Sequence, residues 1–134
     1  IVRIGGSADT LLAANENGDL FAWGLNEYDQ LQMVTDEIQV NYPRHLAFKL
    51  GSIVSVGATG SSCIISNSDG LAYTWGAQIL GFGPEVSSIP RPMLLDPPLF
   101  GSVVNGDGNV SRVFLPELVR NVSLGPDHSL FVTT

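Results

Sequence analysis

The 134-residue sequence predicts an all-β fold built from repeated four-stranded antiparallel sheets, and the repeats are visible directly in the chain. Residues 17–24 recur 52 positions later as residues 69–76, and both copies end in Trp-Gly. Residues 1–5 align with residues 53–57 at the same offset, and residues 121–125 begin a third copy. Self-similarity with a period near 50 residues is typical of solenoids, propellers or arrays.

Within each copy the apolar residues recur with a period of two. Leu11 and Ala13 alternate with Leu12 and Ala14, and the second copy alternates in the same way around Tyr73. This period predicts strands, because successive side chains of a strand point to opposite faces of a sheet.

Turn residues divide the strands of each unit. Asn17-Gly18 and Asp69-Gly70 stand between the second and third apolar runs, where a tight hairpin needs the positive φ values that Asn and Gly adopt at little cost. Each unit is therefore expected to contain two strands, a hairpin, a strand that ends in Trp-Gly, a long polar loop and a last strand. Four antiparallel strands in about 50 residues form one blade of a β-propeller, and about two and a half blades are predicted.

The predicted units cover residues 1–52, 53–118 and 119–134, and the last unit is cut off before its own Trp-Gly. The distance from Gly57 to Gly125 is 16 residues longer than the distance from Gly5 to Gly57, which indicates an insertion at about 77–118. This insertion is rich in proline, which is incompatible with a helix interior or a central strand. The insertion is expected either to bind a partner or to have a structural role within the fold, and both alternatives stay open.

The residues that recur at fixed places receive a structural interpretation. Trp23 and Trp75 are expected to fill the space between neighbouring blades, since an aromatic at one place per repeat suits a stack of sheets. Five glycines are expected at turns or at close backbone approaches, namely Gly5, Gly24, Gly57, Gly76 and Gly125.

Residues 122–129, 18–24 and 69–76 carry a pattern that resembles the repeats of the regulator of chromosome condensation family. The resemblance implies a seven-bladed propeller. Residues 79–84, 89–90 and 97–101 are similar to one mitochondrial branch of that family, which implies a mitochondrial protein and guanine-nucleotide exchange.

The chain departs from the family pattern at two places. Residues 26–32 keep the Asn, Gln and Leu that usually follow Trp-Gly but replace both glycines of that motif. The histidine of the turn survives only as His128, since Asp9 or Ala8 and then Gly60 or Ser61 stand there in the first two copies. Functional residues of the family therefore do not transfer securely by position.

Composition and charge weigh against several classes of function. Six Lys and Arg residues stand against thirteen acids, and this net charge of -7 weighs against a nucleic-acid platform, which needs a basic surface. RNA binding through other parts of a longer protein stays open. No apolar run approaches the roughly 18 residues that span a bilayer. The single cysteine, Cys63, excludes an internal disulfide and is expected to be a small buried side chain rather than a nucleophile.

The sequence predicts no catalytic residue, no cofactor and no metal site. His45 has no Cys or second His at a metal-ligand spacing. His128 and Ser129 are neighbours in a predicted strand, so their side chains point to opposite faces and do not act as a pair.

Four residues are weak candidates for partner binding: Asp36, Glu37, Asp127 and His128. Asp36 and Glu37 belong to an acidic part of the long loop 25–52, which is either a solvated loop or a contact surface, because loops on one face of a scaffold often bind partners. His128 is expected to hydrogen-bond within its turn or to contribute to a partner surface.

Three functions are weighed. The family resemblance implies a guanine-nucleotide exchange factor for a small or dynamin-like GTPase. The mitochondrial branch also suggests a scaffold for ribosome assembly that binds mitochondrial ribosomal RNA or assembly factors and has no exchange activity. The third hypothesis is a purely structural piece whose ligand surface lies on other blades. None of the three functions requires the protein to make or break a covalent bond.

An incomplete propeller leaves a blade face uncovered. If a few hundred Å² of apolar surface were exposed to water, the lost stabilisation free energy would be on the order of 5 to 10 kcal/mol. That loss rivals the stability of a whole domain. The chain is therefore expected to be a fragment that self-associates when it is isolated.

Overall fold

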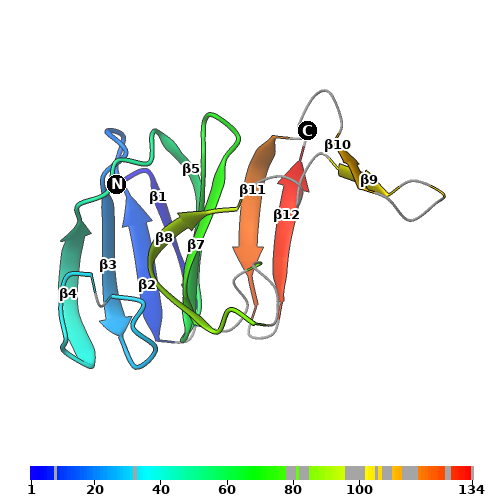
Figure 1. The fold of residues 1–134 in the computed structure, drawn as a ribbon. Helices are drawn as coiled ribbons and strands as arrows, with labels where there is room; N and C mark the ends of the chain where they lie inside the picture. The colour runs from blue at the N-terminus through cyan, green and yellow to red at the C-terminus, as the bar shows by residue number, and fades with distance from the viewer. Residues whose placement is uncertain are drawn as a thin grey trace.

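The computed structural model describes residues 1–7, 9–31, 33–77, 81, 85–95, 102–104, 106, 110–112, 118–125 and 128–133. This part of the chain contains twelve β-strands and no α-helix. Two four-stranded sheets and the pair β11–β12 follow one another across the molecule from left to right (Figure 1). The prediction of an all-β chain with four-stranded antiparallel units is confirmed.

The first sheet has the strand order β1-β2-β3-β4, and every neighbouring pair is antiparallel. Its strands are β1 (Arg3–Ser7), β2 (Thr10–Ala14), β3 (Leu20–Leu25) and β4 (Gln39–Leu46). In the register, Leu12 lies opposite Ala22, so the buried residues of neighbouring strands share one face. The edge strand β4 accommodates Pro43, because an edge strand can spare a ladder hydrogen bond.

The second sheet repeats this arrangement in the order β5-β6-β7-β8. Its strands are β5 (Ile53–Ala58), β6 (Ser62–Asn67), β7 (Ala72–Ala77) and β8 (Ser88–Leu94). The third unit contributes β11 (Val119–Leu124) and β12 (Ser129–Thr133), which pair antiparallel.

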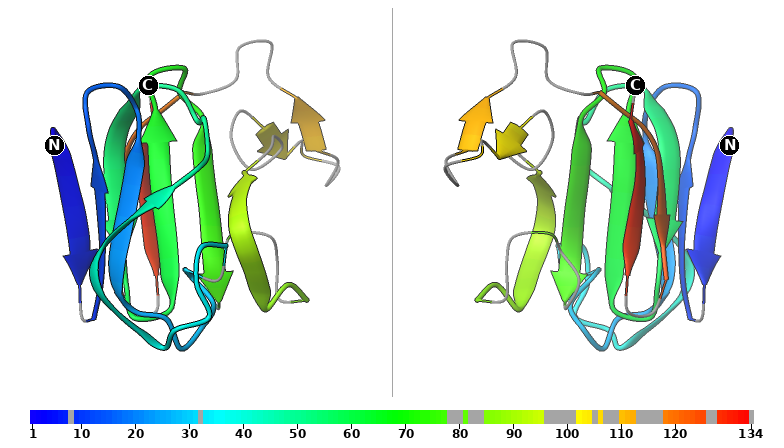
Figure 2. Two further views of the ribbon diagram at one scale, coloured as in Figure 1. Left: turned by 90° about the vertical axis from the view of Figure 1, so that its left-hand side faces the viewer. Right: turned by 90° about the vertical axis from the view of Figure 1, so that its right-hand side faces the viewer.

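The stretch 77–118 contains regular strands. β8 includes Pro90 and Pro92 and is the edge strand of the second sheet. The short strands β9 (Ser102–Val104) and β10 (Val110–Arg112) form a separate antiparallel hairpin. This hairpin stands beyond β8, away from β1 (Figure 2). Most of residues 79–84 and all of 97–101, which carry the resemblance to one branch, lie outside the described residues.

An asparagine two residues before each predicted hairpin position closes the turn. Oδ1 of Asn15 accepts hydrogen bonds from the backbone N–H groups of Asn17 and Asp19, at 3.0 and 2.9 Å. Asn67 does the same for Asp69 and Leu71, at 3.1 and 3.0 Å. The equivalence of these asparagines extends the internal repeat from the sequence into the hydrogen bonding.

The glycine of each Trp-Gly pair is required by its backbone. Gly24 has φ 108° and Gly76 has φ 102°, values that side chains rarely permit. The residue after each glycine donates its N–H to a turn carbonyl, Leu25 to Asp9 at 2.8 Å and Ala77 to Ser61 at 2.9 Å. A Cβ on either glycine would collide with that same carbonyl oxygen.

Apolar side chains fill the space between the first and second sheets. Leu12 and Leu20 from the first sheet meet Ile65 and Trp75 from the second, and all four are fully buried. A smaller cluster, including Ile64, lies between the second sheet and β11. The second sheet is therefore covered on both faces.

The face of the first sheet that points away from the second sheet is partly bare. Ile4 is 64% exposed and Leu11 is 36% exposed, although both are apolar. Their equivalents in the second sheet, Val56 and Cys63, belong to the core between the sheets. The first sheet therefore shows on its open face the side chains that the second sheet buries.

The sheets converge at their first strands. The main contacts between sheets join β1 and β2 to β5, and β11 to β5 and β6. Figure 2 shows β1, dark blue beside the N-terminus, on the opposite side of the stack from β8, in yellow-green. Sheets that meet at their first strands and spread toward their fourth are arranged as the blades of a propeller around an axis.

Candidate functional site

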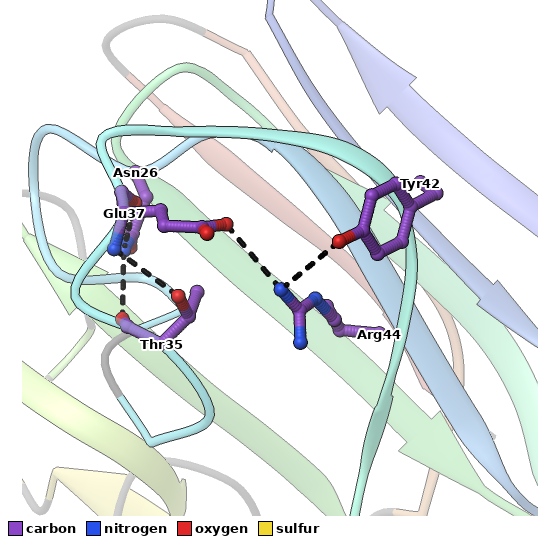
Figure 3. A network of polar contacts seen from close by, with 5 residues as sticks. All are labelled: Asn26, Thr35, Glu37, Tyr42 and Arg44. Carbon is purple, nitrogen blue, oxygen red and sulfur yellow. Dashed lines mark hydrogen bonds and ion pairs between the residues drawn. The ribbon is translucent and has the colours of Figure 1, made fainter.

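Asn26 organises the long loop between β3 and β4. Its Nδ2 donates to the carbonyl oxygens of Thr35 at 3.2 Å and Glu37 at 3.0 Å, as Figure 3 shows. Its Oδ1 accepts the N–H of Leu31 at 2.6 Å, and its own N–H donates to the carbonyl of Ile38 at 2.7 Å. One buried amide therefore holds the two ends of the loop together.

Gln30 attaches the same loop to the second sheet. Its side chain is fully buried, and Nε2 donates to Oγ1 of Thr10 at 3.1 Å and to the carbonyl of Gly60 at 2.9 Å. Its Oε1 accepts the N–H of Tyr28 at 3.0 Å. Its carbonyl accepts the indole N–H of Trp75 at 3.0 Å. A loop of the first unit is thereby fixed to a turn and a strand of the second.

The two repeat tryptophans have different surroundings. Trp75 is fully buried between the two sheets, with its indole nitrogen bonded to the first unit. Trp23 is only partly buried: it packs against the core cluster, but its register partner across β2 is Leu11 on the open face of the first sheet. The structure therefore places one tryptophan at a completed contact between sheets and the other at the open face.

Gly5 and Gly57 lie where consecutive sheets approach one another. A Cβ on Gly5 would stand 2.6 Å from the carbonyl oxygen of Val56 in the next sheet. A Cβ on Gly57 would stand 3.0 Å from Cγ2 of Ile64 in its own sheet and 3.5 Å, an ordinary contact distance, from the backbone nitrogen of Leu124 in β11. The close approach of β1 to β5 therefore requires glycine at position 5.

Asp36 lies at a cleft in the loop that Asn26 organises. This cleft has a volume of about 360 Å³ and is lined by Asn26, Glu27, Asp29, Thr35, Asp36 and Ile38. Asp36 is exposed, and no ion pair joins it to a basic group within the described residues. Its carboxylate is therefore accessible to a partner.

Glu37 is adjacent in sequence but has its own partner. Its Oε2 lies 3.3 Å from Nη2 of Arg44, which also donates to the Tyr42 hydroxyl at 3.5 Å (Figure 3). The guanidinium carbon of Arg44 is 5.0 Å from the centroid of the Tyr42 ring. Such an exposed pair contributes at most about 1 kcal/mol. Glu37 is thus partly neutralised by its own chain, whereas Asp36 is not.

Apolar side chains beside the cleft are exposed to solvent. Ile38 is 64% exposed and Tyr28 is 42% exposed. Aromatic residues are enriched at protein–protein interfaces, so this group is a candidate contact surface. We call Tyr28, Asp36 and Ile38 the loop patch.

His128 belongs to the third unit. Its carbonyl accepts the N–H of Gly125 at 2.8 Å, and its ring occupies the space that a Cβ on Gly125 would need. Asp127 lies outside the described residues. The end of β11 and the start of β12 stand at the same end of the stack as the loop after β3 (Figure 1). His128 directly precedes β12 and Asp36 lies between β3 and β4, so the two residues belong to different units.

Within the described ranges, no three His, Cys, Asp or Glu side chains converge as a metal site would require. Burial raises the pKa of the Cys63 thiol to about 12, so the thiol is protonated at neutral pH. The part of the chain described also contains no helix with the length and hydropathy that a membrane crossing needs.

Sequence reasoning did not find the roles of Asn26 and Gln30. Both belong to the motif that follows Trp-Gly, in which two glycines are replaced. One of those positions, Asp29, has φ 61°, so the backbone conformation that favours glycine persists without glycine. The retained Asn, Gln and Leu were the signal that could have located the buried network.

Comparison with known proteins decides the family. No model of a protein family matches the sequence. The chain is 37% identical over 115 residues to the RCC1-like G exchanging factor-like proteins of mouse and human. It resembles the crystal structure of human WBSCR16 with a TM-score of 0.84 and 32% identity, covering 99% of this chain and 32% of that one. This chain belongs to the RCC1-like family.

More distant members share the fold. The structure of Prp20p from Saccharomyces cerevisiae matches 98% of this RCC1-like chain with a TM-score of 0.63 and 17% identity. The same yeast protein bound to Kap60 matches with a TM-score of 0.64. The chain covers 43% and 41% of those two structures and 25% of the mouse and human relatives. The fold is that of a partial RCC1-type β-propeller.

Proposed function

We propose that this chain is part of an RCC1-like propeller that promotes guanine-nucleotide exchange on a GTPase, with the loop patch as a contact surface. The relatives from mouse and human are named for G exchange, and Prp20p is described with its binding to Gsp1p and histones. The observation that carries the proposal is a loop fixed by Asn26 and Gln30 that nevertheless exposes Tyr28, Asp36 and Ile38.

A fixed loop suits this role because exchange requires no bond to be made or broken. The factor stabilises the nucleotide-free GTPase, and by reciprocity it weakens nucleotide binding by the same coupling free energy. A thousandfold acceleration of release corresponds to about 4 kcal/mol. The Asp36 carboxylate competes for the cation or lysine that serves the phosphates, and Ile38 supplies apolar contact. Glu37 contributes less because Arg44 already pairs with it.

The test is release of fluorescent GDP from small and dynamin-like GTPases in the presence of the full-length protein. Asp36→Asn and Ile38→Ser are expected to reduce the acceleration at least about tenfold, as for residues central to an interface. Glu16→Gln is the matched control, because it removes an exposed carboxylate from the hairpin between β2 and β3 at the other end of the sheets. Equal activity of Asp36→Asn and Glu16→Gln would contradict the role of the loop patch.

The mitochondrial location is part of the proposal and is tested by fractionation of cells that express the full-length protein. The alternative function is a scaffold for mitochondrial ribosome assembly. Binding of mitochondrial ribosomal RNA or assembly factors without any effect on nucleotide release would favour that scaffold over exchange. Because these 134 residues have a net charge of -7, RNA contacts would come from local basic groups or from other parts of a longer protein.

A further inference from the structure

A groove on the first strands of the three units gathers hydrogen-bond donors. It has a volume of about 410 Å³ and is lined by Arg3, Ile4, Val54, Ser55, Val56, Arg120 and Asn121. These residues come from β1, β5 and β11, the strands at which the sheets converge. We call this feature the inner-strand groove.

Arg3 is held in place along the groove by backbone carbonyls. Its Nε donates to the carbonyl of Val54 at 2.7 Å, and its Nη1 donates to the carbonyl of Val2 at 2.7 Å. These two bonds orient the planar guanidinium while leaving Nη2 for another acceptor. No carboxylate pairs with Arg3 among the described residues.

Asn121 is oriented by the residues beneath it. Its Oδ1 accepts hydrogen bonds from the hydroxyl of Ser55 and from the N–H of Val122, the latter at 3.2 Å. Because Oδ1 already accepts these two hydrogen bonds, Nδ2 is the part of the amide that can donate to a ligand. The residue contributes a second donor.

Arg120 supplies a positive charge from β11. Its side chain is exposed, and within the described part of the chain no acid pairs with it. The protein has only six Lys and Arg residues and a net charge of -7, yet two of those six line one groove that no described acid lines. The local charge is therefore opposite to that of the chain as a whole.

We propose that the inner-strand groove binds a phosphate group of a small ligand. Two guanidinium groups and a side-chain amide offer donors without a competing acid, and guanidinium groups match phosphate oxygens in geometry. The volume is within the range of small-molecule sites. Blades added to complete a ring would pack on the sheet faces, so a groove on the first strands stays open to the central channel. This inference does not rest on the proposed exchange function.

The probe is inorganic pyrophosphate, titrated calorimetrically into the full-length protein at low salt. Arg120→Gln and Arg3→Gln are each expected to weaken binding about tenfold, as for the loss of a charged hydrogen bond. Arg91→Gln is the matched control, because it removes the same charge from an exposed position on β8. Thermal unfolding of each variant shows that the fold is retained, and Arg120→Gln breaks none of the backbone contacts made by Arg3.

Further titrations with GDP and citrate identify the source of the phosphate. Binding of pyrophosphate and GDP with equal affinity would assign recognition to the phosphates alone, and tighter binding of GDP would add a nucleoside contribution. Both results support the proposal. Absence of pyrophosphate binding, equal weakening by Arg91→Gln, or equal binding of citrate would overturn it.

Discussion

Gln30 is expected to be the most important single polar side chain for the contact between the first two units. The change Gln30→Ala removes donors to Thr10 and Gly60 and an acceptor for Tyr28. Each lost hydrogen bond in a buried setting costs about 1 kcal/mol, so the free energy of unfolding should fall by about 3 kcal/mol. Urea unfolding of the full-length protein measures this change.

Gln39→Ala is the matched control for this prediction, because Gln39 is an exposed glutamine on β4. It should change the free energy of unfolding by less than about 0.5 kcal/mol. Hydrogen exchange of residues 26–31 and 33–38 should also become faster in Gln30→Ala, since the loop loses its attachment. Equal free energies of unfolding for the two variants, with unchanged exchange of the loop, would refute the role assigned to Gln30.

Three further predictions concern single side chains. Asp29→Gly should raise the free energy of unfolding by up to about 1 kcal/mol, and Asp29→Val should lower it, because the φ of 61° disfavours a β-branched residue. A higher melting temperature for Asp29→Val than for Asp29→Gly would contradict this reasoning. Cys63 should not react with a thiol reagent at pH 8 until the protein unfolds, because burial raises its pKa to about 12; rapid labelling of the native protein would contradict its burial. The pKa of Asp19 is lowered first by the hydrogen bond from Asn15 and then by Lys49. The stabilisation from the ionised Asp19 is therefore present above pH 3.8 and is lost as the pH falls through the folded-state pKa. An acid unfolding curve that is unchanged in Asp19→Asn would contradict this stabilisation.

The sequence was sufficient to predict the sheets because the signals for them are local. The alternation around Leu12 and the Trp-Gly ending of each third strand depend on neighbours within one unit. Apolar periodicity and turn residues therefore located both four-stranded sheets. The hairpins were placed correctly at Gly18 and Gly70, which have φ of 81° and 80°. The positive φ expected at the residue before each glycine was wrong, because neither Asn17 nor Asp69 has one.

The sequence predicted the apolar contact of Trp75 between units but not the polar partners across it. Gln30 meets Gly60 and Trp75 only because two sheets stack, and the retained Gln does not by itself name those partners. The candidate site was likewise only partly visible. The acidic loop suggested Asp36 and Glu37 equally, but the pairing of Glu37 with Arg44 depends on how β4 runs beside the loop. The inner-strand groove also needs three first strands brought together from separate repeats.

The central claim is that these residues are blades of an RCC1-like propeller whose open face, bearing Ile4, Leu11 and Trp23, requires a neighbouring sheet. The most direct test is the mass in solution of the isolated 134-residue chain, measured by light scattering after size exclusion beside the full-length protein. We expect a discrete oligomer or an aggregate for the isolated chain and a well-behaved particle for the full-length protein. A stable monomer of 14.2 kDa would show that the open face needs no cover and would contradict the account.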